Sequence, residues 1–304
     1  MTEAIFSILQ RSSLSDSLAL FKANQEFDKW LVLSDYTHQR DAHTHETYCF
    51  SILPVFFPFE GLRSAIADLQ PTDLKKTQRV NADFLRLVAS DQFLHFVFSF
   101  GRDKQTPLRG STIESSRETI RELRDYVTQN DALNFDNPAF GELKKRVALV
   151  EQKSNKAGFN YILFDKMIII SCVAAILASW ITKYTAAREI NWMSDRDNTT
   201  TYCDGIIYDL FSMSYSGSID RINAGRQAQL WTSHEDANGT MWFDELIRIP
   251  DFLAGAFSRV SLATGSVGAG KQAHIVRKVM HRVHFFTIKK EDDDLVLRRE
   301  RLGT

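Results

Sequence analysis

Short apolar runs recur along the chain, and longer stretches with helical spacing of apolar positions lie between them. The runs that predict strands are residues 30–34, 47–55, 93–100, 189–194 and 228–233. The stretches that predict helices are residues 59–69, 84–88, 114–127, 141–152, 200–213 and 245–262. The first two strands are close enough to form a hairpin, and the third completes a meander. Strands and helices mixed in this order are typical of an α/β domain.

One segment is apolar on every side. Residues 167–181 carry no charged side chain, but the segment is only 15 residues long. A membrane span needs roughly 20 apolar residues, so we interpret residues 159–182 as a buried core helix and expect no membrane association. No basic, apolar and small-residue series opens the chain, so we expect no secretory signal.

We divide the chain into three parts. Residues 1–27 predict a helical lead, residues 28–264 the α/β domain, and residues 265–304 a basic extension packed on the same domain. A glycine-rich connector, residues 265–270, marks the second boundary. It is followed by Lys271 and so matches the pattern G-x-x-x-x-G-K. The next residue is Gln272, which lacks the hydroxyl that a phosphate loop supplies to Mg²⁺, and we do not interpret it as a nucleotide site.

Composition leaves the partner open. The chain has 37 Lys and Arg against 38 Asp and Glu, so any nucleic-acid surface has to be local. The three cysteines, Cys49, Cys172 and Cys203, are widely spaced and show no zinc-finger pattern. We interpret them as reduced core thiols of a cytoplasmic protein.

Three carboxylates lie where predicted elements begin or end. Asp35 ends the first apolar run, Asp195 follows the fourth, and Asp251 lies near the start of the last long helix. Mg²⁺ and Mn²⁺ prefer oxygen ligands, and phosphodiester chemistry needs several carboxylates converging from different elements. The alternative is ordinary capping: Asp195 and Asp197 cap the next helix, Asp35 opens a turn, and Asp251 caps its own helix.

Four short motifs carry a resemblance to a known superfamily. They are Ser-Asp-Tyr at 34–36, Glu-Thr-Tyr-Cys-Phe at 46–50, Ser-Asp-Arg-Asp at 194–197 and Ile-Pro-Asp-Phe-Leu-Ala-Gly-Ala at 249–256. In this order, over about residues 28–260, they resemble the RNase H-like superfamily and, within it, an uncharacterised bacterial group. That group has an Asp ending its first strand, a later strand ending in Ser-Asp, and a late Asp before an Ala-Gly-Ala helix.

The resemblance implies an RNase H-like mixed five-stranded sheet flanked by helices, with helical insertions. It also implies a nuclease that uses Mg²⁺ or Mn²⁺, with Asp35, Asp195 and Asp251 as ligands and Asp197 or Glu46 as a fourth acid. Many members carry Asp-Glu-Ser on the first strand, whereas Tyr36 follows Asp35 here, and Glu46 is the candidate replacement. The rival interpretation is a catalytically inactive module of the same fold that binds nucleic acid, a protein partner or a second copy.

A histidine string offers a different chemistry. Residues 41–45 read Asp-Ala-His-Thr-His, a string seen in zinc hydrolases, in which His43 and His45 could ligate one ion and His95 or His234 could add to them. Those enzymes place the string on a strand end of an eight-fold strand and helix barrel, and this chain shows no such repeat. We therefore favour a loop with solvated histidines.

The C-terminal extension is the candidate nucleic-acid surface. Its basic side chains include Lys271, Arg277, Lys278 and Arg282, and His and Phe residues lie between them. Cations with aromatic faces suit a phosphate backbone and unstacked bases. The alternative is a solvated helix and an edge strand balanced by the acids at 291–294. The two interpretations stay open.

Overall fold

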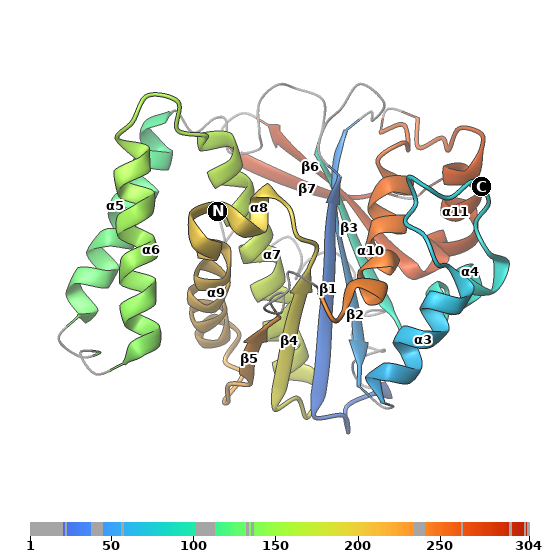
Figure 1. The fold of residues 1–304 in the computed structure, drawn as a ribbon, viewed down its shortest axis with the longest axis horizontal. Helices are drawn as coiled ribbons and strands as arrows, with labels where there is room; N and C mark the ends of the chain where they lie inside the picture. The colour runs from blue at the N-terminus through green and yellow to red at the C-terminus, as the bar shows by residue number, and fades with distance from the viewer. Residues whose placement is uncertain are drawn as a thin grey trace.

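Seven strands form one mixed sheet in the computed structural model (Figure 1). The structure describes residues 21, 23–37, 45–55, 58–100, 113–131, 134, 137–233, 241–262, 264–291, 294–300 and 302. The strands are β1 (Lys29–Thr37), β2 (Glu46–Pro54), β3 (Leu94–Phe100), β4 (Glu189–Ser194), β5 (Gln229–Thr232), β6 (Val283–Glu291) and β7 (Asp294–Arg299). Their order across the sheet is β5-β4-β1-β2-β3-β6-β7. The first three strands pair antiparallel, β4 is parallel to both β1 and β5, and β6 is parallel to β3 and antiparallel to β7.

Helices cover both faces of this sheet (Figure 1). They are α3 (Phe59–Leu69), α4 (Ala82–Val88), α5 (Ile113–Asn130), α6 (Pro138–Ser154), α7 (Tyr161–Tyr184), α8 (Asn198–Thr201), α9 (Ile206–Ile222), α10 (Asp244–Phe257) and α11 (Lys271–Val279), with 3-10 turns η1 (Tyr202–Gly205) and η2 (Met280–Arg282). One core lies between the sheet and α7 and α9, and α5 and α6 flank these two helices. The second core lies between the other face and α10, α3, α4 and α11.

Helix α7 is the apolar segment expected to form a core helix. Among the described residues it is the one helix long and apolar enough to cross a membrane, with a mean hydropathy of 2.1 over its most apolar window, yet 78% of that window is buried in the fold. Its buried residues include Val173, Ala174 and Ile176, which pack in the same core as Trp30 and Trp192 of the sheet. A helix covered this completely by its own fold fits a soluble protein.

The alternation of side chains along β1 determines which residues can share a site. Successive residues of a strand point to opposite faces. Trp30, Val32 and Tyr36 belong to the core under α7, whereas Leu31 and Leu33 belong to the core under α10. Asp35 has the parity of Leu31 and Leu33, so it points toward α10.

The expected α/β class is confirmed, but the expected strand count is wrong. Five strands were predicted, and the structure has seven because β6 and β7 extend the sheet beyond β3. The β-rich stretch near residues 283–288 was visible in the sequence. Its partner is β3, which lies almost 190 residues earlier, with His95 paired to Val283. The helical lead predicted for residues 1–27 falls almost wholly outside the described residues.

Candidate functional site

Asp35 and Asp195 lie side by side at the ends of two neighbouring parallel strands. The register pairs Ser34 with Ser194, the last residue of β4. The backbone N–H of Asp195 donates to the carbonyl oxygen of Ser34 at 3.1 Å, which continues the pairing one step beyond β4. Residues at equivalent positions of parallel strands point to the same face. The two carboxylates therefore lie on the α10 side of the sheet.

Asp251 comes to the same place from α10. It lies inside this helix, just after Pro250, so the capping role considered for it is wrong. Its Oδ2 accepts the backbone N–H of Leu74 at 3.0 Å. One turn later on the same helix, Gly255 leaves room for the Leu74 side chain, because a Cβ there would lie 2.5 Å from Leu74 Cδ2. The motif Asp-Phe-Leu-Ala-Gly-Ala thus holds the segment around Leu74.

The three carboxylates lie in largely buried surroundings that raise the pKa of each. Asp35 is only 7% exposed. Burial raises its pKa well above the ordinary value, and the nearby charges of Asp251 and then Asp195 raise it further. Burial raises the pKa of Asp195 to about 6, with additional contributions from Asp197 and Asp251. Burial also raises the pKa of Asp251, and the charge of Asp73 raises it further, whereas its interaction with Asp35 lowers it. All three acids therefore hold protons more tightly than exposed carboxylates.

Asp197 performs the capping role that the sequence offered as the alternative. It is the N-cap of α8, and its Oδ1 accepts the backbone N–H of Thr199 at 2.7 Å and of Thr200 at 3.1 Å. The Thr200 hydroxyl accepts the backbone N–H of Asp197 in return, at 3.1 Å, which completes a capping box. The negative charge of Asp197 also contributes to raising the pKa values of Asp35 and Asp195.

Glu46 is not brought to the acidic cluster. It has the strand parity of Tyr48, which lies in the core under α7, so it faces away from Asp35. Its Oε1 accepts Lys166 Nζ at 2.5 Å, and its Oε2 accepts the Tyr48 hydroxyl at 3.2 Å. The structure therefore places Glu46 in an ion pair between β2 and α7, on the opposite face from the three acids.

Tyr36, the departure from the motif of the resembling group, also points away from the acids. Its hydroxyl lies 2.7 Å from Ser34 Oγ and accepts Ser194 Oγ at 3.0 Å, and Trp192 Nε1 donates to Ser34 Oγ at 2.8 Å. This network ties β1 to β4 directly beneath Asp35 and Asp195. A carboxylate at position 36 would face the α7 side, so Tyr36 leaves no gap among the three acids.

Two histidines of the predicted zinc set, His45 and His95, are buried in the core. His45 is 1% exposed, and its Nε2 lies 3.0 Å from the carbonyl oxygen of Phe257. His95 uses both ring nitrogens, with Ser51 Oγ at 2.8 Å and the Val88 carbonyl at 2.9 Å. Burial lowers the pKa of His95 to about 4, so it is neutral near pH 7. His43 and His234 lie outside the described residues, and the open sheet gives no barrel for a zinc hydrolase.

The basic side chains predicted to bind nucleic acid have separate roles. Lys271 Nζ donates to the carbonyls of Leu74 at 2.7 Å and Thr77 at 2.5 Å, and Arg277 donates to two carbonyls of the preceding connector. Arg282 forms an ion pair with Asp91. Lys278 is exposed and lines a groove described below. Lys271 and Arg277 thus use their charges to hold loops of the fold.

The donor set of the acidic cluster suits a hard divalent cation. All three groups are carboxylates, the ligands that Mg²⁺ and Mn²⁺ prefer, and a cation would offset the cost of burying their negative charges. In the part of the chain that the structure describes, no three His, Cys, Asp or Glu side chains are already close enough to hold one ion together. Ligation by all three would require their side chains to turn further toward one point.

The roles of Leu74, Gly255 and Tyr36 were not deduced from the sequence. Gly255 and Tyr36 stood inside quoted motifs, but nothing in the sequence paired them with a function. A cavity of about 300 Å³ also borders the end of β4, lined by Ser194, Arg196 and Tyr208 among others.

Comparisons of the chain with family models, with curated proteins and with solved structures give no match. What the site can do therefore follows from its own residues.

Proposed function

We propose that this protein hydrolyses phosphodiester bonds of nucleic acids with Mg²⁺ or Mn²⁺, using Asp35, Asp195 and Asp251. One observation carries the proposal: carboxylates from β1, the end of β4 and α10 gather in one largely buried place, where the charges of Asp251 and Asp195 add to burial in raising the pKa of Asp35. Like charges gathered in a partly buried place reduce stability, and such clusters are typical of functional sites. Capping does not explain Asp35 or Asp251, since neither caps a helix.

The resemblance to RNase H-like proteins supports the same function. The order β5-β4-β1-β2-β3 contains a three-stranded meander and two later strands, in agreement with the five strands that the resemblance implies. The acids also occupy the implied places: the first strand, the end of the fourth strand and the last long helix before the basic extension. The additional strands β6 and β7 continue the sheet at its other edge, beyond β3.

The residues of the acidic cluster and its supports would have different roles in hydrolysis. A divalent cation bound to these carboxylates would supply water activation and stabilisation of the leaving oxygen. The pKa of Asp195 is about 6, so near neutral pH its carboxylate is ionised and able to hold a cation. The Leu74 amide fixes one oxygen of Asp251. The network of Ser34, Tyr36 and Ser194 holds the two strand ends in register.

A second candidate is a catalytically inactive member of the same fold that only binds its partner. The observation in its favour is that no three possible ligands among the described residues are yet arranged to hold one ion. This candidate predicts nucleic-acid binding without cleavage at any concentration of Mn²⁺. It also predicts that neutralising Asp35 changes nothing but stability.

We place the protein in the cytoplasm. Cys49, Cys172 and Cys203 are all buried, and within the described residues none of them forms a disulfide. Buried free thiols persist in reducing compartments, where disulfides are rare.

Cleavage of labelled single-stranded RNA and DNA in the presence of Mn²⁺ tests the function. We expect Asp35→Asn to lower the cleavage rate at least about 100-fold. Substitution of residues that only support metal ligands already lowers metal affinity or activity by about 10–100-fold, and Asp35 is proposed as a ligand itself. Asp220→Asn is the matched control, since Asp220 is an exposed acid of α9. Calorimetric titration with Mn²⁺ gives a second readout, in which Asp35→Asn weakens binding and the control does not. Equal cleavage and equal Mn²⁺ binding by all three proteins would exclude this site.

A further inference from the structure

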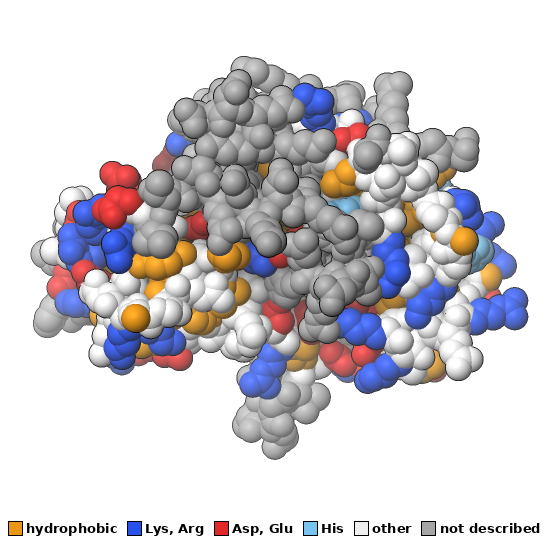
Figure 2. Space-filling view, turned by 90° about the horizontal axis from the view of Figure 1, so that it is seen from above, with side chains coloured by type: hydrophobic (Ala, Val, Ile, Leu, Met, Phe, Trp, Pro, Cys, Tyr) orange, Lys and Arg blue, Asp and Glu red, His pale blue; other side chains and the backbone are white. Residues whose placement is uncertain are grey.

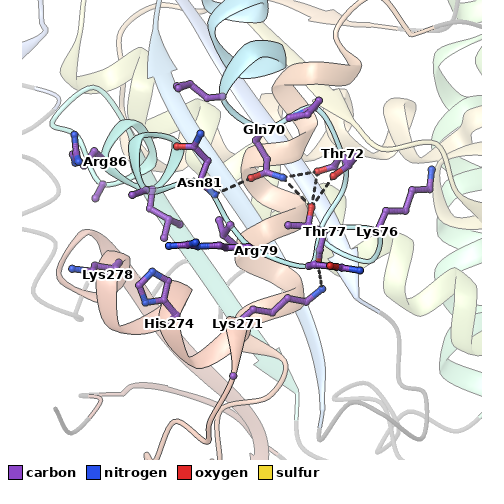
Figure 3. A pocket seen from close by; sticks show the side chains of 18 of the residues that line it. Gln70, Thr72, Lys76, Thr77, Arg79, Asn81, Arg86, Lys271, His274 and Lys278 are labelled. Carbon is purple, nitrogen blue, oxygen red and sulfur yellow. Dashed lines mark hydrogen bonds between the residues drawn. The ribbon is translucent and has the colours of Figure 1, made fainter.

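A basic groove lies beside the loop that joins α3 to α4. The same loop contacts the acidic cluster through the Leu74 N–H, which donates to Asp251. The groove has a volume of about 1420 Å³ and runs between the segment from Asp68 to α4 and helix α11 (Figure 3). Ligand pockets for small molecules typically have about 300–1,000 Å³, so this groove suits an extended ligand. Figure 2 shows Lys and Arg side chains outnumbering Asp and Glu at the end of the molecule where Figure 1 places α3, α4 and α11.

The lining of the groove is strongly positive. Five Lys and Arg side chains line it against one acid, Asp68. They are Lys76, Arg79, Arg86, Lys271 and Lys278. Within the described chain, Lys76 pairs with Asp73 at 3.6 Å and Arg86 pairs with Asp83, both of them exposed pairs that contribute little.

Arg79, Lys278 and His274 are the groove residues best placed to receive an anion. All three are exposed, and among the described residues none of them forms an ion pair. Figure 3 shows Arg79 extending from the loop toward the side of the groove where α11 presents His274 and Lys278. Cations from two separate elements thus line both sides of one concave surface.

The wall opposite α11 is held in place by its own hydrogen bonds. Gln70 Nε2 donates to Thr77 Oγ1 at 2.9 Å, and Gln70 Oε1 accepts the backbone N–H of Asn81 at 3.3 Å. Thr77 Oγ1 donates to the carbonyl of Asp73 at 2.8 Å. Lys271 fastens the same segment to α11 through the Leu74 and Thr77 carbonyls (Figure 3). A wall fixed in this way lowers the entropic cost of binding.

We propose that this groove binds the phosphate backbone of single-stranded nucleic acid, with Arg79, Lys278 and His274 at successive phosphates. Cations that neutralise phosphates supply most of such affinity. A duplex carries its phosphates on a convex exterior and would meet only the rim, whereas a single strand can lie inside. The side-chain NH2 of Asn81, whose Oδ1 caps α4, and the imidazole of His281 can then reach unpaired base edges. The choice of nucleic acid rests on the proposed function, whereas the charge of the groove does not.

Fluorescence anisotropy in EDTA tests the groove without any catalytic readout. The probes are labelled oligonucleotides of about 12 nucleotides, within the range of about 4–16 for such sites, single-stranded or annealed to their complement. The variant is Arg79→Glu with Lys278→Glu. The control is Lys156→Glu with Arg188→Glu, which makes the same charge change at exposed residues outside the groove lining.

We expect the groove variant to bind the single strand at least about tenfold more weakly, and its salt slope to fall by about 0.7 for each phosphate that the protein no longer neutralises. The control should bind like the wild type, and the wild type should prefer the single strand to the duplex. The neutral pair Arg79→Gln with Lys278→Gln should show a smaller decrease in affinity, and circular dichroism should show both variants folded. Unchanged binding by the groove variant, or an equal decrease in the control, overturns the proposal, as does preference for duplex.

The same proteins distinguish the two proposals. If Asp35→Asn binds the single strand like the wild type while the groove variant does not, the groove proposal holds whether or not the wild type cleaves. If the wild type cleaves and the groove variant binds and cleaves equally well, the groove proposal fails and the proposed function stands.

Discussion

Neutralising Asp195 should make the folded protein more stable, and the size of the gain can be worked out from its environment. The pKa of Asp195 rises from the ordinary 3.8 to about 6 on folding. The folded state therefore binds more protons than the unfolded state between these pH values, and stability falls as pH rises through the window. Each pKa unit is worth about 1.4 kcal/mol, so the full cost above pH 7 is about 3 kcal/mol. Partial exposure of Asp195 to solvent screens this to roughly half.

Asp195→Asn keeps the shape and the oxygen that accepts the Arg196 N–H, which in the wild type lies 2.8 Å from Asp195 Oδ1. Urea unfolding in EDTA at pH 7.5 should show the variant to be about 1–3 kcal/mol more stable than the wild type. At pH 3.5 the difference should vanish, because the wild-type carboxyl is then neutral too. If the variant were less stable at pH 7.5, or if the gain were equal at both pH values, Asp195 would not belong to a repulsive cluster.

Two further predictions concern residues outside the three acids. Asp197→Ala should lower stability by about 1 kcal/mol through loss of the cap of α8, measured by urea unfolding; Asp197→Ser, which can still cap, should recover most of this stability. The pKa of His95 falls from 6.5 to about 4 on folding, so stability should drop by about 3 kcal/mol as pH falls through that window. His95→Gln should flatten the pH dependence, and an unchanged slope would mean that other groups cause it.

The sequence predicted the elements of the first part of the sheet well because their signals are local. Apolar runs near residues 30–34 and 189–194 became β1 and β4, and the acids that follow them could be named. The face that each residue occupies depends on strand register, which no local signal supplies. Glu46 was therefore grouped with Asp35, although pairing of Asp35 with Cys49 turns Glu46 to the other face.

Contacts between distant segments were beyond the reach of sequence patterns. Nothing local indicated that β6 would pair with β3, or that Asp251 would receive the amide of Leu74. The basic extension was recognised, yet its groove needs Arg79 from a loop far earlier in the chain. The polar residues 70–83 showed only the composition of a loop, and their role depends on where α11 packs.

Leu74 has a position whose consequence reaches both sites. Its N–H donates to Asp251 in the acidic cluster, and its carbonyl accepts Lys271 at the edge of the groove. Any cation that draws Asp251 away, and any anion that draws Lys271 away, would act on the same residue from opposite sides. Binding at two coupled sites is reciprocal. If a cation in the acidic cluster changes the affinity of the groove for its anion, the anion changes the affinity of the cluster for the cation by the same factor. If the acidic cluster binds a cation and the groove binds a single-stranded nucleic acid as proposed, this one buried leucine would couple the two binding events.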